Sequence, residues 1–121
     1  MTKSADDLLG TARRHIRRVG PHELASIMRT GGLVVDIRPE SQRREEGELE
    51  GAHVIERNVL EWRLDPSSPH RMAELAGYDQ EIVIVCSEGY ATSLAAASLA
   101  GLGHRRCCDL IGGYRAWRCR S

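Results

Sequence analysis

The sequence predicts an α/β fold built on a mainly parallel sheet with helices on both faces. Residues 33–37 and 81–85 are short apolar runs rich in β-branched residues, the pattern of strands buried on two faces. Segments with helical spacing separate such runs, and this alternation is typical of a parallel sheet. With 121 residues, 41% of them hydrophobic, the chain has the length of one domain with a single core.

The chain begins with a predicted amphipathic helix over residues 5–19. Its apolar residues fall near helical spacing, and we interpret the basic residues beside them as a solvated face: Arg13, Arg14, Arg17 and Arg18. Gly20 and Pro21 end this helix. Pro21 suits the first turn of a second helix, which continues through Met28.

Further segments continue the alternation toward the C-terminus. They are weaker strands at 52–55 and 105–111, an alanine-rich helix at 92–102, and charged connections with helical pieces at 39–46 and 58–76. A turn at Gly112 and Gly113 follows the last strand, and Trp117 on a final helix is expected to pack into the core. Because no long linker divides the chain, we expect a helical extension over residues 1–20 and one domain over residues 21–121.

Charge and hydropathy exclude several classes of partner. The chain carries 17 basic and 17 acidic side chains, so it has no overall field that would attract nucleic acid. No run approaches the roughly 18 apolar residues that a membrane-spanning helix needs, and the first ten residues lack the pattern of a signal peptide. We therefore expect a soluble, cytoplasmic protein that binds neither nucleic acid nor membrane.

The cysteines and histidines indicate no metal site and no disulfide. Cys86, Cys107, Cys108 and Cys119 form no paired pattern of the kind that binds zinc, and the five histidines are scattered. In a reducing compartment these cysteines are expected to be thiols. Cys107 and Cys108 are adjacent in a predicted strand, so they face opposite sides of the sheet and cannot share a pocket. We expect no metal and no cofactor.

Cys86 is the candidate nucleophile. It directly follows the strand at 81–85, at the sheet edge where ligands bind in open α/β folds. A five-residue loop then leads into a helix that starts near Thr92: Ser87, Glu88, Gly89, Tyr90 and Ala91. Such a loop can turn successive N–H groups toward the sulfur, and the helix N-terminus also favours a thiolate. From position alone, a buried inert thiol remains the alternative.

Four segments resemble the single-domain rhodanese family of sulfurtransferases. They are CSEGYAT at 86–92, DLIGGYRAW at 109–117, LVVDIRPE at 33–40 and GELEGAHVIE at 47–56. They occur in the family's order and extend the resemblance over residues 21–118.

The resemblance implies a three-layer fold with a twisted five-stranded sheet and a persulfide on Cys86. Residues 87–92 would then form the substrate-binding loop, and Asp36 with Arg38 would be a supporting pair that fixes the loop to the sheet. The expected partners are a small-molecule or protein sulfur donor and a thiol acceptor, for a protein that is a monomer or weak dimer. The chemistry would be covalent catalysis in two half-reactions.

The loop departs from the family pattern in its charge. Members that use thiosulfate commonly carry basic residues where this chain has Ser87 and Ala91, and Glu88 adds a negative charge. The usual histidine of the second signature is replaced by Glu48. Nearby charged residues could supply positive charge at the pocket mouth or form a solvated face: Arg57 and Arg63, with Glu56, Glu61 and Trp62.

Three other functions use a similar architecture. Related dual-specificity phosphatases place an arginine six positions after the cysteine, but this chain has Thr92 there, which argues against phosphatase activity. A non-catalytic partner-binding module would keep the fold without using the thiol. A thiol redox or arsenate reductase type enzyme would need a second cysteine near Cys86.

Overall fold

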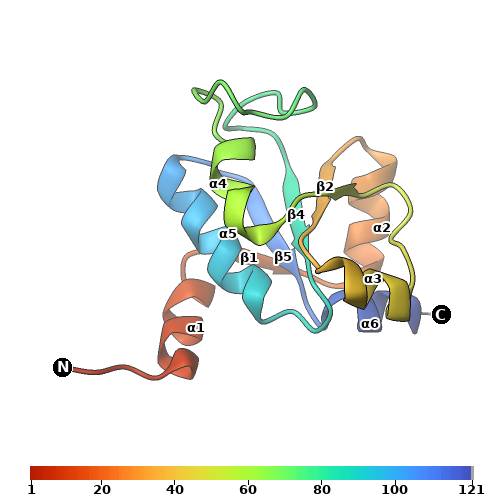
Figure 1. Cartoon of the computed structure of the whole chain (residues 1–121), viewed down its shortest axis with the longest axis horizontal. Helices are drawn as coiled ribbons and strands as arrows, with labels where there is room; N and C mark the ends of the chain where they lie inside the picture. Colours follow the sequence, from red (N-terminus) through yellow and green to blue (C-terminus); the bar gives the residue numbers. More distant parts are fainter. Residues whose placement is uncertain (121) are drawn as a thin grey trace.

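The computed structural model of the chain describes residues 1–120 and shows a five-stranded parallel sheet between two layers of helices (Figure 1). The strands are β1 (Arg17–Val19), β2 (Leu33–Asp36), β3 (His53–Val54), β4 (Ile82–Val85) and β5 (Cys107–Leu110), in the spatial order β1-β5-β4-β2-β3. The helices are α1 (Ala5–Arg13), α2 (Pro21–Arg29), α3 (Glu40–Glu46), α4 (Leu60–Arg63), α5 (Ala91–Leu102) and α6 (Gly113–Arg118), with a 3₁₀ turn η1 (Arg57–Val59) before α4. This arrangement confirms the predicted fold class.

The sheet separates two apolar layers. Side chains alternate along β4, so that Ile84 packs with α4 and α5 on one face and Val83 packs with α2 and α6 on the other. Both side chains are fully buried, and burial of a side chain of this size contributes about 1.5–3 kcal/mol. The continuous apolar runs in the sequence therefore reflect strands covered on both faces.

The N-terminal region differs from the sequence prediction. Helix α1 ends at Arg13, and residues 17–19 form strand β1, which pairs in parallel with β5. The predicted helix over residues 5–19 is therefore wrong in its last part. Val19 fits both a helical and a strand pattern, and a strand of three residues depends on pairing with a distant segment. The remaining predicted strands and helices agree with the structure to within two residues at each end.

The turn between β5 and α6 brings α6 against the loop that carries Cys86. Gly113 has a φ of +63°, in the left-handed region that favours glycine. A Cβ atom at this position would lie 2.5 Å from the carbonyl oxygens of Cys86 and Ser87. The predicted turn is found at Ile111 and Gly112, whereas Gly113 begins α6 and allows the close approach.

We predict that Gly113→Ala lowers the free energy of unfolding by more than about 2 kcal/mol, because it combines left-handed strain with a clash against main-chain atoms. The control is Gly101→Ala on α5, where a Cβ would meet no atom within 4 Å. That substitution should stabilise the protein by about 0.5–1 kcal/mol, because alanine favours a helix interior. Urea unfolding measures both changes; equal stabilities for the two variants would contradict the prediction.

Candidate active site

Cys86 directly follows the carboxyl end of β4, in the loop that leads into α5. Its residue exposure is 9%, so Cys86 is nearly buried. Its Sγ accepts a hydrogen bond from the N–H of Gly89 at 3.2 Å and lies 3.4 Å from Oγ1 of Thr92. Within residues 1–120, Gly89 supplies the one N–H that binds Sγ, whereas the sequence suggested several.

Gly89 allows the loop to fold tightly. Its φ of +88° is left-handed, and a Cβ there would lie 2.9 Å from the carbonyl oxygen of Leu110 and 3.0 Å from the N of Gly112. The loop therefore passes directly against the end of β5. This contact turns the Gly89 N–H toward Sγ and explains why a glycine is needed three residues after Cys86.

Helix α6 holds the first half of the loop through the main chain. The N–H of Tyr114 donates to the carbonyl oxygen of Cys86 at 2.7 Å, and the N–H of Arg115 donates to that of Ser87 at 3.1 Å. These N–H groups belong to the first helical turn, where they have no partner within the helix. The segment at 109–117 thus contributes to the site by fixing the backbone on both sides of the Cys86–Ser87 peptide bond.

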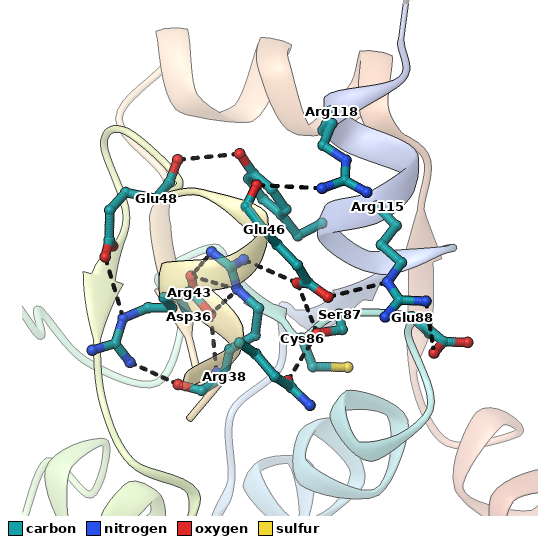
Figure 2. A network of polar contacts seen from close by, with 12 residues as sticks. Asp36, Arg38, Arg43, Glu46, Glu48, Cys86, Ser87, Glu88, Arg115 and Arg118 are labelled. Atoms are coloured by element: carbon teal, nitrogen blue, oxygen red, sulfur yellow. Dashed lines mark hydrogen bonds and ion pairs between the residues drawn. The ribbon is translucent and has the colours of Figure 1, made fainter. Parts of the chain in front are cut away.

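Asp36 and Arg38 form a buried ion pair at the end of β2 (Figure 2). Nη2 of Arg38 donates to Oδ2 of Asp36 at 2.7 Å, and the guanidinium lies 4.1 Å from the ring centroid of Tyr114. The same guanidinium donates through Nη1 to Glu46 at 3.2 Å. These contacts place Arg38 between β2, α3 and α6.

Glu46 carries this network to the loop. Its Oε1 accepts a hydrogen bond from Oγ of Ser87 at 2.9 Å, and its Oε2 accepts one from Nε of Arg115 at 3.1 Å. Burial alone would raise the pKa of Glu46, but the hydrogen bonds from Ser87, Arg115 and Arg38 outweigh it and hold the pKa below its usual value. Glu46 therefore remains a carboxylate at neutral pH.

The negative charge of Glu88 is paired with the guanidinium of Arg115. Its carboxylate is half-exposed and lies 3.3 Å from Nη1 of Arg115. Figure 2 shows Arg115 linked to both Glu46 and Glu88. The negative charge of Glu88 is therefore partly neutralised by Arg115, which weakens its effect on Sγ.

Thr92 joins the sulfur to a second buried carboxylate. Its hydroxyl donates to Oδ2 of Asp109 at 3.0 Å, and Asp109 is fully buried. On the next strand, Nε of Arg18 donates to Oδ1 of Asp109 at 2.9 Å. This cluster was not predicted from the sequence, because Arg18 and Asp109 come together only when β1 pairs with β5.

The remaining loop residues lie at the surface. Tyr90 is 58% exposed, and Ala91 is exposed as the first residue of α5. Ser87 and Thr92 are buried, because their hydroxyls bind Glu46 and Asp109. The structure thus brings residues 87–92 around Cys86 but divides them between contact with the protein and contact with solvent.

A cavity of about 450 Å³ opens beside the carboxyl ends of β2 and β3. Its polar lining includes Arg38, Arg43, Glu56, Arg57 and Asn58. Arg57 is paired with Glu61 at 2.8 Å, which partly neutralises it. Arg63 instead donates to the carbonyl oxygen of His70, and Trp62 is exposed beside Glu61, so these residues do not line the cavity.

The other cysteines differ from Cys86 in their surroundings. Cys107 and Cys108 are buried on opposite faces of the sheet, as predicted. Burial raises the pKa of Cys108 to about 12, and burial with the neighbouring Cys108 and Asp109 raises the pKa of Cys107 further. Both thiols are therefore uncharged at neutral pH, whereas Cys119 is exposed.

Two kinds of feature are absent from residues 1–120. No group of three or more His, Cys, Asp or Glu side chains there is arranged to hold a metal ion. None of the helices in the same part of the chain has the length and apolar character needed to cross a membrane.

Comparison with known proteins gives a consistent result. Residues 20–119 match the family model of the rhodanese-like domain. The chain is similar to the thiosulfate sulfurtransferase GlpE of Ectopseudomonas mendocina, with 30% identity over 102 residues that cover 84% of each protein. It is also similar to GlpE of Haemophilus influenzae, with 26% identity over 87% of this chain and 90% of the relative.

Solved structures show the same fold. The human single-domain sulfurtransferase superposes with a TM-score of 0.72 at 26% identity, over 86% of this chain and 97% of the human one. A Rhodopseudomonas palustris protein of unknown function, described as a possible tyrosine phosphatase, superposes with a TM-score of 0.86 at 25% identity. That superposition covers 98% of this chain and 91% of the other, so it includes the N-terminal segment.

We predict that Arg38→Met lowers the free energy of unfolding by about 3–5 kcal/mol, because it leaves the carboxylate of Asp36 buried without its partner. The control is Arg44→Ala, which removes an exposed pair with Glu40 one helical turn away. That change should cost less than about 0.5 kcal/mol. Chemical denaturation measures both; a loss below about 1 kcal/mol for Arg38→Met would show that the pair does not anchor this end of the sheet.

Proposed function

The chain belongs to the rhodanese-like domain family, and we propose that it is a sulfurtransferase in which Cys86 carries sulfane sulfur as a persulfide. The observation that carries the proposal is the environment of Sγ, which receives the N–H of Gly89 at 3.2 Å at the start of helix α5. An oriented N–H and a helix N-terminus both stabilise negative charge on sulfur. The similarity to proteins named thiosulfate sulfurtransferase supports the same activity.

The reaction proceeds in two displacements on sulfur. In the first, the Cys86 thiolate attacks the sulfane sulfur of the donor, a new S–S bond forms, and the rest of the donor leaves with the electron pair of the bond that breaks. In the second, an acceptor thiolate attacks the outer sulfur and Cys86 leaves as the thiolate. These two displacement reactions need no external oxidant or reductant, and the enzyme is expected to follow ping-pong kinetics.

The structure supports this chemistry over the alternatives. A reductase needs a second reactive thiol; Cys107 and Cys108 are buried with raised pKa values, which leaves the exposed Cys119 as the other thiol that a disulfide with Cys86 would need. A phosphatase needs a guanidinium at the position of Thr92, whose hydroxyl is instead bound to Asp109. A non-catalytic binding module needs no hydrogen bond to Sγ. The hydrogen bond from the N–H of Gly89 to Sγ therefore favours a catalytic role for Cys86 over a binding module.

We predict that Cys86→Ser abolishes sulfur loading and leaves the fold intact, because it removes the nucleophile and changes little volume. Intact mass spectrometry after incubation with thiosulfate or glutathione persulfide should show one added sulfur atom on the wild type, which a thiol reductant removes. Cys119→Ser, at the exposed cysteine that follows α6, should load like the wild type. Loading of Cys86→Ser at another cysteine would reject the assignment of Cys86, and an unloaded wild type would favour a binding module.

The loop charge leads to a prediction about the donor. We expect Ala91→Arg to raise thiosulfate turnover more than turnover with a less charged persulfide, since Ala91 is exposed at the start of α5 beside the loop. A single added charge near a dianion contributes about 1 kcal/mol after screening, or several-fold in rate. The preference for thiosulfate should shrink as salt is raised.

The matched control for this charge is Leu102→Arg, at the exposed far end of α5. It adds the same charge about 16 Å along the helix, and this control is measured at about 0.15 M salt, where the Debye length is roughly 8 Å. Steady-state rates with both donors should be unchanged in this variant. If Ala91→Arg leaves the ratio of the two rates unaltered at low salt, residue 91 does not face the donor.

A further inference from the structure

We propose that Arg13 and Arg18, from the N-terminal segment, are positioning residues for the loop that carries Cys86. The proposal rests on the proposed function of Cys86 and extends it. Nη2 of Arg13 donates to the carbonyl oxygen of Gly89 at 2.9 Å, and Nη2 of Arg18 donates to the same oxygen at 3.0 Å. The N–H of Gly89 is the group that binds Sγ. One loop residue is therefore held by two guanidiniums on one side and holds the sulfur on the other.

Gly89 needs this external support. A glycine has a wide range of φ and ψ, so its own conformational preference does not fix the direction of its N–H. The two shortest hydrogen bonds to the Gly89 carbonyl come from charged donors, which are stronger than neutral ones, and Oγ of Ser93 lies farther away at 3.4 Å. Fixing the Gly89–Tyr90 peptide therefore restricts the adjoining Glu88–Gly89 peptide, whose N–H points at the sulfur.

Arg18 is fixed by its place in the sheet. It lies directly opposite Asp109 in the pairing of β1 with β5, and its Nε donates to Oδ1 of that carboxylate at 2.9 Å. Hydroxyls of Thr92 and Ser93 donate to Oδ2 of Asp109 at 3.0 and 2.8 Å. Because Thr92 also contacts Sγ, Arg18 is connected to the sulfur through both Asp109 and Gly89.

Arg13 is fixed by helix α1. It is the last residue of α1, which packs against α5, and its Nε donates to Oγ of Ser93 at 3.0 Å. Its guanidinium also lies 5.7 Å from the ring centroid of the exposed Tyr90. Arg13 therefore contacts the loop and the first turn of α5 together, which sets their relative position.

Both arginines lie outside the segment that matches the family model, which begins at residue 20. Inside the loop, the positions at which thiosulfate-using members of the family commonly carry basic residues hold Ser87 and Ala91. The N-terminal segment thus supplies two cations behind the loop, where the loop itself supplies none. The sequence pattern had suggested a solvated face for these arginines, and the structure shows Arg13 and Arg18 in contact with the site instead.

Arg13→Ala tests the proposal, with Arg14→Ala as the matched control. Arg14 is the next residue and donates within its own segment, to Oγ1 of Thr11 at 3.2 Å. We expect Arg13→Ala to lower kcat for sulfur transfer about tenfold with KM for the donor within about twofold, because the nucleophile is misplaced while the donor site is retained. Arg13→Lys should recover part of the loss, since an ammonium can still reach the carbonyl of Gly89. Arg14→Ala should match the wild type.

A second measurement does not depend on sulfur transfer. In the unloaded protein, the amide proton of Gly89 should move upfield in Arg13→Ala and stay unchanged in Arg14→Ala, as seen by NMR. If the wild type takes up no sulfur on Cys86, the proposed function fails while this shift still tests the positioning. The proposal is overturned if the Gly89 resonance does not move, or if Arg13→Ala raises KM and leaves kcat unchanged.

Discussion

The site depends on how the main chain of the loop between β4 and α5 is held. The carbonyl oxygens of Cys86 and Ser87 accept from α6, and the carbonyl oxygen of Gly89 accepts from two arginines. A loop at the carboxyl edge of a parallel sheet has no strand partner of its own, so these hydrogen bonds must come from other elements. Because α6 and the two arginines bind these carbonyl oxygens, the loop directs the N–H of Gly89 toward the sulfur.

Two buried carboxylates flank the loop, and each is paired with an arginine. Asp36 and Arg38 act through Glu46 on Ser87, whereas Asp109 and Arg18 act through Thr92 on Cys86 itself. Buried ion pairs of this kind contribute little net stability, because desolvation offsets their attraction. Their directional hydrogen bonds do define where the loop lies. The chain has no net charge, but two of its acidic and two of its basic side chains form the ion pairs that flank the loop.

The sequence predicted the elements with strong local signals. The continuous β-branched runs of β2 and β4 and the alanine-rich composition of α5 identify these elements, and Cys86 followed from its place after a buried strand. Strand β1 was missed because it has three residues, two of them arginines, and exists only by pairing with β5. The roles of Arg13, Glu46 and Asp109 were missed for the same reason, since each of these residues meets its partners only in the folded chain.

The placement of the arginines also bears on which chemistry the loop performs. A phosphatase loop needs a guanidinium that points into the loop to bind phosphate oxygens, but Arg13 and Arg18 bind the outer side of the loop through Gly89 and Asp109. In that position they stabilise the backbone and cannot also grip a phosphate. The contacts of Sγ itself are the N–H of Gly89 and the hydroxyl of Thr92. In a fold that is shared with a possible phosphatase, Arg13 and Arg18 therefore bind the loop backbone and Asp109 rather than a phosphate.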